Sequence, residues 1–275
     1  MFNDRVETGT LDLSELAQHW QLLDAAYDAV RHVTAKRRPE ILHARMIDEG
    51  QVAGHRVYMA AQRYLMIARD NHQALVALLQ SPHGLSVSAP WNLLRGTFEA
   101  SFYAAWVLDP EESLERRRRA LRLEIADERE QALYYDDLLK VFGEDLEADP
   151  AAAKQDFDQA ARDVDTTYRA EAQELGLTYP PPGPKVLHGL AELSCATEME
   201  HGALAYKAVW RGLSGLAHGH VGAYLRASDK LGTQPRQGGV TALLSVNDGY
   251  FLSLAGCTNS LHLEALRLLL LRSQP

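Results

Sequence analysis

The sequence predicts an all-α protein, a single-domain multi-helix bundle of about eight helices with little or no sheet, over residues 1–275. Apolar residues recur at spacings of three and four along most of the chain, which is the pattern of amphipathic helices. Serine, aspartate and proline stand where these segments begin or end, in positions that cap or stop helices. Only residues 240–246 are compatible with a strand, and they are equally compatible with the start of a helix.

The expected helices differ in length and charge but share the same apolar spacing. They cover residues 13–30, 39–79 with a pause at Gly50 or Gly54, 88–108, 111–141, 151–175, 186–196, 199–217 with a break near Thr197, and 250–271.

The first half of the chain contains the clearest helix boundaries. Asp12 or Ser14 is placed to cap the first helix, and the basic segment 36–39 ends it at a proline. The serine and proline of residues 88–90 suit the cap and first turn of the helix that stops at residues 109–110. That helix carries two tryptophans and two phenylalanines, so we expect it to be the most buried element.

Four consecutive arginines, Arg116–Arg119, begin a long charged helix. Such a run resembles a nucleic-acid patch, but Glu112 and Glu115 lie four residues before Arg116 and Arg119 and can pair with them across one helical turn. We therefore interpret the run as a solvated face of the helix.

Proline, glycine and acidic residues mark the expected connections. Residues 143–150 form an acidic loop, and residues 178–185 form a stiff proline-rich connector. Residues 231–239 are expected to be a glycine-rich loop, followed by a final helix capped by Asn247 or Asp248. The chain beyond the connector is also helical and would otherwise need a core of its own, so we expect one domain.

Composition limits the class of protein. A formal charge of −9 argues against a general duplex-binding protein, because phosphate contacts need a basic surface. The only cysteines, Cys195 and Cys257, are expected to be reduced. Residues 1–10 lack the apolar core of a signal peptide, and Leu268–Leu271 is too short to cross a bilayer, so we expect a cytoplasmic protein with no membrane partner. Abundant arginine and alanine suggest a bacterial source.

The most chemically informative stretch surrounds Arg211 and His218. Seven residues advance a helix by about 700°, so these two side chains share one face with Ser214 between them and could hold a phosphate. Arg95 and Glu99 are four residues apart on the aromatic helix. They could form an ion pair that supports the core or a site that orients an anionic group. His218 could equally cap a helix end, and the Ser214 hydroxyl could bond the preceding turn.

Arg211-x6-His218 near a helix end resembles the Arg-x4–6-His motif of HEPN domains. Arg95 and Glu99 in an aromatic helix, followed much later by Leu213–Gly219, resemble a group of bacterial helical proteins near that family. HEPN domains include metal-independent ribonucleases of toxin–antitoxin and defence systems. The resemblance implies that Arg211 and His218 are catalytic residues and that Arg95, Glu99 and Ser214 are ligand-binding residues. It also implies that no cofactor or metal is needed.

The same resemblance implies attack of a ribose 2′-hydroxyl on the adjacent phosphate of RNA. His218 would act as general base or acid, and Arg211 would neutralise the developing charge. It also implies a homodimer in which two motifs face each other, and an antitoxin or regulatory protein as a partner. A catalytically inactive helical binding or scaffold protein with the same fold is the alternative.

A second alternative is a ferritin-like dimetal oxidase or oxygenase. The motifs Glu40-x-x-His43 and Glu198-x-x-His201 each place a carboxylate and an imidazole on one helix face, the spacing found in ferritin-like di-iron bundles. Two further carboxylates, such as Glu15 and Glu99, would be needed. The sequence contains no P-loop, dinucleotide fingerprint, nucleophile elbow or zinc-finger spacing.

Overall fold

The structure, a computed structural model, describes residues 13–35, 43–81, 88–146, 149–237 and 239–274. Within these residues it confirms the all-α class, with eleven helices and one two-stranded antiparallel sheet. In chain order the elements are α1 (Ser14–Ala35), α2 (Ala44–Glu49), α3 (Gly54–Leu79), α4 (Ala89–Leu108), α5 (Ser113–Leu146), α6 (Pro150–Glu174), α7 (Val186–Glu192), α8 (Ser194–Glu198), α9 (Gly202–Ala217), α10 (Val221–Arg226), β1 (Ser228–Arg236), β2 (Gly239–Val246) and α11 (Asp248–Ser273).

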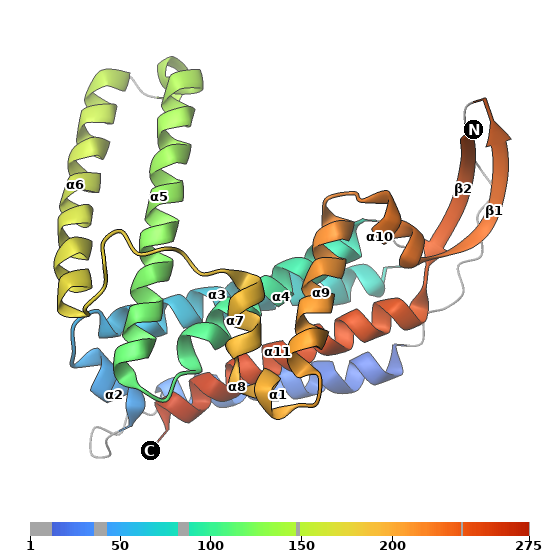
Figure 1. The fold of residues 1–275 in the computed structure, drawn as a ribbon, viewed down its shortest axis with the longest axis horizontal. Coiled ribbons are helices and arrows are strands. Elements are labelled where there is room, and N and C mark those ends of the chain that lie inside the picture. Colours follow the sequence, from blue (N-terminus) through green and yellow to red (C-terminus); the bar gives the residue numbers. More distant parts are fainter. Residues whose placement is uncertain (1–12, 36–42, 82–87, 147–148, 238, 275) are drawn as a thin grey trace.

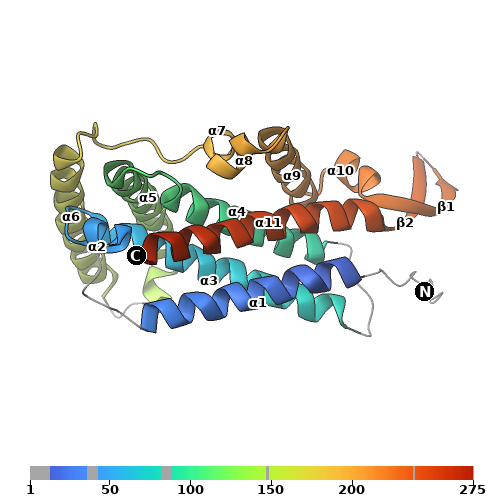
Figure 2. The same ribbon diagram turned by 90° about the horizontal axis from the view of Figure 1, so that it is seen from below.

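The body of the molecule is a bundle of α1, α3, α4 and α11, which lie side by side along its long axis (Figure 2). Helices α7, α8 and α9 cover α4 on the face away from α1. Helix α4 was expected to be the most buried element. It contacts other helices on several sides, and its side chains Trp91, Phe98 and Phe102 are each at most 1% exposed. Large aromatic side chains of α4 therefore fill the space between the bundle and the helices that cover it.

The ends of several elements differ from the sequence expectation. Helix α5 continues to Leu146 instead of ending in an acidic loop at residue 143, and residues 147–148 lie outside the described part of the chain. The expected helix over residues 186–196 is two short helices interrupted at Leu193, and α9 starts at Gly202 instead of residue 199.

The segment expected to be a glycine-rich loop, residues 231–239, is largely the strand β1. It pairs antiparallel with β2, from Ser228 opposite Val246 to Arg236 opposite Gly239. The two strands project from the body as a ribbon (Figure 1). Asn247 caps α11 as expected, because its side-chain oxygen accepts a hydrogen bond from the backbone of Tyr250.

The interpretation of Arg116–Arg119 as a solvated face is wrong. Arg116 is 2% exposed and forms a two-pronged ion pair with Asp48, which is fully buried. The Arg116 Nε and Nη2 atoms each lie 2.8 Å from a different carboxylate oxygen of Asp48. Its Nη1 atom donates to the carbonyls of Pro110 and Glu111, and Tyr58 donates its hydroxyl hydrogen to Asp48 at 2.8 Å.

The other three arginines of the run also bind backbone carbonyls of neighbouring elements. Arg117 donates to Val52, Arg118 to Leu175 and Arg119 to Trp106, at 2.8–3.1 Å. The expected Glu115–Arg119 contact is present at 3.3 Å, whereas Arg116 pairs with Asp48 instead of Glu112. The run therefore fixes the position of the α5 N-terminal half and is not a surface available to nucleic acid.

Helices α5 and α6 leave the body together and form a projecting two-helix arm (Figure 1). A small apolar cluster at its base includes Ile125 of α5 and Tyr168 of α6. Arg56 of α3 pairs with Glu171 of α6 at 2.8 Å and so joins the arm to the bundle. The cluster and the ion pair together anchor the arm at its base.

A buried polar cluster lies between α1, α3 and α11. The Tyr27 hydroxyl donates to the carbonyl of Leu65 at 2.8 Å and lies 2.6 Å from Nε2 of His262. A hydroxyl has one hydrogen to donate, so His262 must be the donor in the second contact. Burial lowers the pKa of His262 to about 3, with a smaller contribution from the neighbouring His72, whose own pKa burial also lowers.

Replacing Asp48 should strongly destabilise the fold. Asp48→Asn leaves the Arg116 guanidinium buried without its counter-charge, which should lower the free energy of unfolding by about 3–5 kcal/mol. Asp137→Asn is the control, because Asp137 is 78% exposed and its pair with Lys140 is solvated, so its effect should be below ~1 kcal/mol. Urea denaturation measures both changes, and equal losses would contradict a structural role for the buried pair.

The buried imidazole should make stability depend on pH. Between the unfolded pKa of about 6.5 and the folded pKa of about 3, the unfolded chain binds a proton that folded His262 does not, so stability falls as pH falls below 6.5. One such group should lower the free energy of unfolding by about 2 kcal/mol between pH 7 and pH 5.

Urea denaturation of His262→Gln at both pH values tests this dependence. The difference in the free energy of unfolding between pH 7 and pH 5 should be about 2 kcal/mol smaller in this variant than in the wild type. His55→Gln should keep the wild-type difference, because His55 is exposed on α3 in the folded protein. A His262→Gln protein with the wild-type pH dependence would show that the ring is protonated inside the fold.

Candidate functional site

Arg95 and Glu99 lie one turn apart on α4, and the expected pair between them is confirmed. The Arg95 Nε atom donates to Oε1 of Glu99 at 3.1 Å, with both side chains about one-quarter exposed. The indole N–H of Trp210 on α9 donates to the same Glu99 oxygen at 3.2 Å. Glu99 therefore links two helices as well as orienting the guanidinium of Arg95.

His218 lies at the C-terminal end of α9, where its backbone N–H donates to the carbonyl of Ser214 at 3.0 Å. Its exposed ring reaches α4, with Nε2 3.3 Å from Nη1 of Arg95. A guanidinium donates hydrogen bonds and cannot accept them, so Nε2 is the unprotonated nitrogen in this contact. His218 is thus both at a helix end, as the structural alternative held, and part of a side-chain contact between helices.

Arg211 is exposed on α9, and no described residue forms a hydrogen bond or ion pair with its guanidinium. The Ser214 hydroxyl likewise has no hydrogen-bond partner in the described chain, either Arg211, His218 or the preceding turn. The structure therefore joins Arg95, Glu99 and His218 directly, whereas Arg211 lies exposed on α9 without a hydrogen bond or ion pair to any of them in the described part of the chain.

The glycines in this stretch have a packing role that sequence analysis missed. A Cβ atom at Gly212 would lie 2.8 Å from the hydroxyl oxygen of Tyr250 on α11. A Cβ atom at Gly215 would lie 3.1 Å from that of Ala223 on α10. Gly219 follows His218 with φ +71°, a left-handed conformation that favours glycine and ends the helix. Close packing therefore fixes the position of α9 along its axis and its rotation about that axis relative to α10 and α11.

The surroundings of Glu99 are partly dry. Tyr103, one turn further along α4, has its pKa raised to about 12 by burial and by the nearby Glu99 carboxylate. Arg95 pairs with Glu99, whereas Arg211 on α9 has no carboxylate partner among the described residues.

Only one of the two predicted metal motifs lies wholly within the described residues, and it does not form a shared helix face. Helix α8 ends at Glu198, and His201 has a left-handed backbone just before α9, so the two residues do not lie on one helix. Glu40 lies outside the described residues, and His43 caps α2 through Nδ1. The described ranges contain no group of three or more candidate metal ligands.

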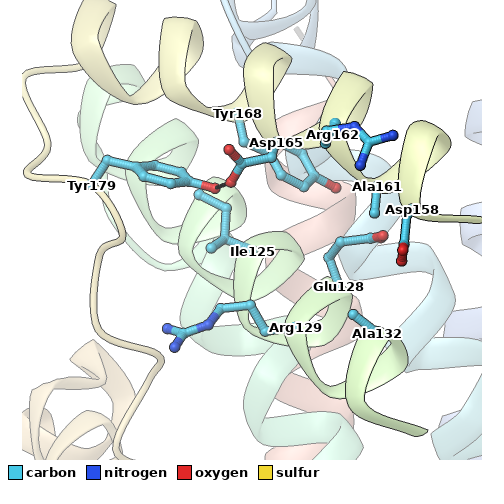
Figure 3. Close-up of a pocket in the computed structure, with 10 residues that line it drawn as sticks. All are labelled: Ile125, Glu128, Arg129, Ala132, Asp158, Ala161, Arg162, Asp165, Tyr168 and Tyr179. Carbon is cyan, nitrogen blue, oxygen red and sulfur yellow. Dashed lines mark hydrogen bonds between the residues drawn. The ribbon is translucent and has the colours of Figure 1, made fainter. Parts of the chain in front are cut away.

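Two hollows lie elsewhere in the described structure. One of about 370 Å³ separates α5 from α6, where carboxylates and two tyrosines face each other (Figure 3). Two of its acidic residues already have partners: Asp158 binds Lys154, and Asp165 binds both Arg169 and the hydroxyl of Tyr179. The other, about 360 Å³, lies beneath the proline-rich connector.

Comparison with models of protein families, with curated proteins and with solved structures finds no match to this chain. Among the described helices, none is both long enough and apolar enough to span a membrane.

The Arg95–His218 contact predicts a tautomer. In the wild type, nitrogen-15 spectra should show the His218 ring protonated at Nδ1 and unprotonated at Nε2, because Arg95 supplies the hydrogen at Nε2. Arg95→Met removes that donor and should shift the tautomer populations of His218. The exposed ring of His220, whose side chain has no hydrogen-bond partner in the described chain, should be unchanged. A wild-type His218 protonated at Nε2 would contradict the contact.

Proposed function

We propose that the α4–α9 surface of this protein, formed by Arg95, Arg211 and His218, binds a phosphate of RNA and cleaves the chain without a metal ion. The observation that carries the proposal is the 3.3 Å contact between Arg95 and His218, which are 123 residues apart in the sequence. It gathers a phosphate-binding group and a proton-transfer group at one exposed place. The resemblance of Arg211-x6-His218 to the HEPN motif supports the same activity.

Each group has a distinct role in the proposed reaction. A phosphate oxygen takes the hydrogen bond that Arg95 donates to His218, which frees Nε2 to accept the proton of the ribose 2′-hydroxyl. The 2′-oxygen forms a bond to phosphorus while the bond from phosphorus to the 5′-oxygen breaks. Arg211 neutralises the negative charge that develops. The imidazolium returns its proton to the 5′-oxygen, which leaves a 2′,3′-cyclic phosphate and a 5′-hydroxyl.

The proposal includes a homodimer that meets beside this surface. Leu204 on α9 and Val221 and Leu225 on α10 are 66%, 73% and 44% exposed, which leaves apolar side chains uncovered on the two helices that flank His218. A symmetric contact through these helices would bring two copies of Arg211 and His218 close together. An antitoxin or regulatory protein that covered the same apolar side chains would block access to RNA.

Labelled single-stranded RNA tests the activity. Wild-type protein should cleave in the presence of a metal chelator, and His218→Ala should lower the rate by about 100-fold or more. Arg211→Gln should lower it by about 100-fold, because it removes one charge that stabilises the transition state. His220→Ala, two residues from His218, is the matched control and should retain the wild-type rate.

Thermal denaturation of each variant separates loss of chemistry from loss of folding. Equal cleavage by wild type and His218→Ala would show that a contaminant or another site is responsible. No cleavage by the wild type would rule out the ribonuclease. In that case a catalytically inactive binding or scaffold protein becomes the better interpretation of the fold.

A further inference from the structure

The hollow beneath the proline-rich connector is separate from the α4–α9 surface and has a different composition. It has a volume of about 360 Å³ and lies between the end of α4, the first half of α5 and α7. The connector forms its outer wall at Pro182–Pro184, where it passes across α5 on its way to α7 (Figure 1). This volume is at the lower end of the range for small-molecule sites, about 300–1,000 Å³.

Two guanidinium groups are held in place at the inner wall of the hollow. Arg119 donates to the carbonyl of Trp106 at 2.8 Å, and Arg122 donates through Nε to the carbonyl of Pro182 at 3.0 Å. Both groups lie over the indole ring of Trp106, at 5.0 and 5.7 Å from its centroid. Stacking and hydrogen bonds fix their orientation in advance, which lowers the entropy cost of binding a ligand.

The charges that line the hollow are not balanced. Its carboxylates are already engaged: Glu115 lies 3.3 Å from Arg119, and Glu192 lies 3.1 Å from Nε2 of His188. Arg122 has no carboxylate partner in the described structure, and neither does the exposed Lys185 at the start of α7. Three permanent cations therefore face two carboxylates, which leaves one net positive charge. Both carboxylates lie within 4 Å of Arg119, at 3.3 Å for Glu115 and 3.9 Å for Glu192, so Arg122 and Lys185 are the cations without a carboxylate partner in the described structure.

The walls of the hollow are rigid. Prolines restrict the connector backbone, and they have no N–H group that would need a partner. A Cβ atom at Gly189 of α7 would lie 2.7 Å from the ring of Phe102, so α7 packs closely on α4. The distance between Arg122 on α5 and Lys185 beside α7 is therefore set by packed elements and does not depend on a loose surface loop.

We propose that this hollow binds a small phosphorylated molecule, no larger than about a mononucleotide, with its phosphate between Arg122 and Lys185. The two free Nη groups of Arg122 match the oxygen atoms of a phosphate, and Lys185 adds a flexible point charge. Trp106 is only 4% exposed, and the guanidinium groups of Arg119 and Arg122 lie over its ring. The ligand is therefore recognised by charge and not by stacking on the indole. This site does not depend on the proposed ribonuclease activity.

Isothermal titration calorimetry of the full chain tests the site with pyrophosphate, adenosine 5′-monophosphate and adenosine as probes. The two phosphorylated probes should bind at low ionic strength, and adenosine should not. Arg122→Gln and Lys185→Gln should each weaken binding at least tenfold. Arg129→Gln is the matched control, because Arg129 lies seven residues further along α5 and lines the other hollow, and it should bind as the wild type does.

A conservative variant distinguishes loss of binding from loss of structure. Arg122→Lys keeps the charge but not the two-pronged geometry, so it should bind more weakly than wild type and more tightly than Arg122→Gln, with an unchanged melting temperature. Absence of phosphate binding by the wild type would overturn the proposal. So would equal weakening by Arg122→Gln and Arg129→Gln, or binding of adenosine as tight as that of its monophosphate.

Discussion

The buried pair of Asp48 and Arg116 is the constraint on which the arrangement of this protein depends. Taking two charges out of water is costly, and the cost is offset only if the remaining donors and acceptors are also satisfied. Here Tyr58 of α3 and two carbonyls of the α4–α5 link supply those partners. Arg272 of α11 binds carbonyls of the same link at 2.9–3.1 Å. One polar corner therefore joins α2, α3, α5 and α11, and it fixes the direction in which α5 leaves the bundle.

That corner also explains where sequence reasoning succeeded and where it failed in the fold. Apolar spacing and caps are local signals, so they correctly predicted the long helices and the Asn247 cap of α11. The partner of Arg116 lies 68 residues earlier, and a helical spacing rule can only propose Glu112, four residues away. An ion pair between neighbouring turns of one helix stabilises it by only tenths of a kcal/mol. The buried partner Asp48 has a larger effect, because it allows the Arg116 guanidinium to lie inside the protein. Residues 240–246 were compatible with a strand or the start of a helix, and they form β2. The strand β1 was missed because its glycine and proline are as typical of loops as of bent strands.

The candidate site shows the same division between local and distant contacts. Arg95 and Glu99 were predicted to pair because they are one turn apart on one helix, and they do. The contact of Arg95 with His218 and that of Trp210 with Glu99 join α4 to α9, and no spacing within one helix predicts them. The helix predicted to end at residue 217 does end at Ala217, and His218 is its C-cap, which agrees with the structural interpretation of this histidine.

The arm formed by α5 and α6 has a consequence for how this architecture can vary. Both of its helices join the body at the same end, and the contacts that anchor it, such as Arg56 with Glu171, are confined to its base. Beyond that base the described residues of the two helices contact each other, as in the pair of Lys154 with Asp136. Whole turns could be added to or removed from both helices together without moving any residue of the bundle. The length of the arm can therefore change by insertion or deletion while the rest of the molecule stays the same.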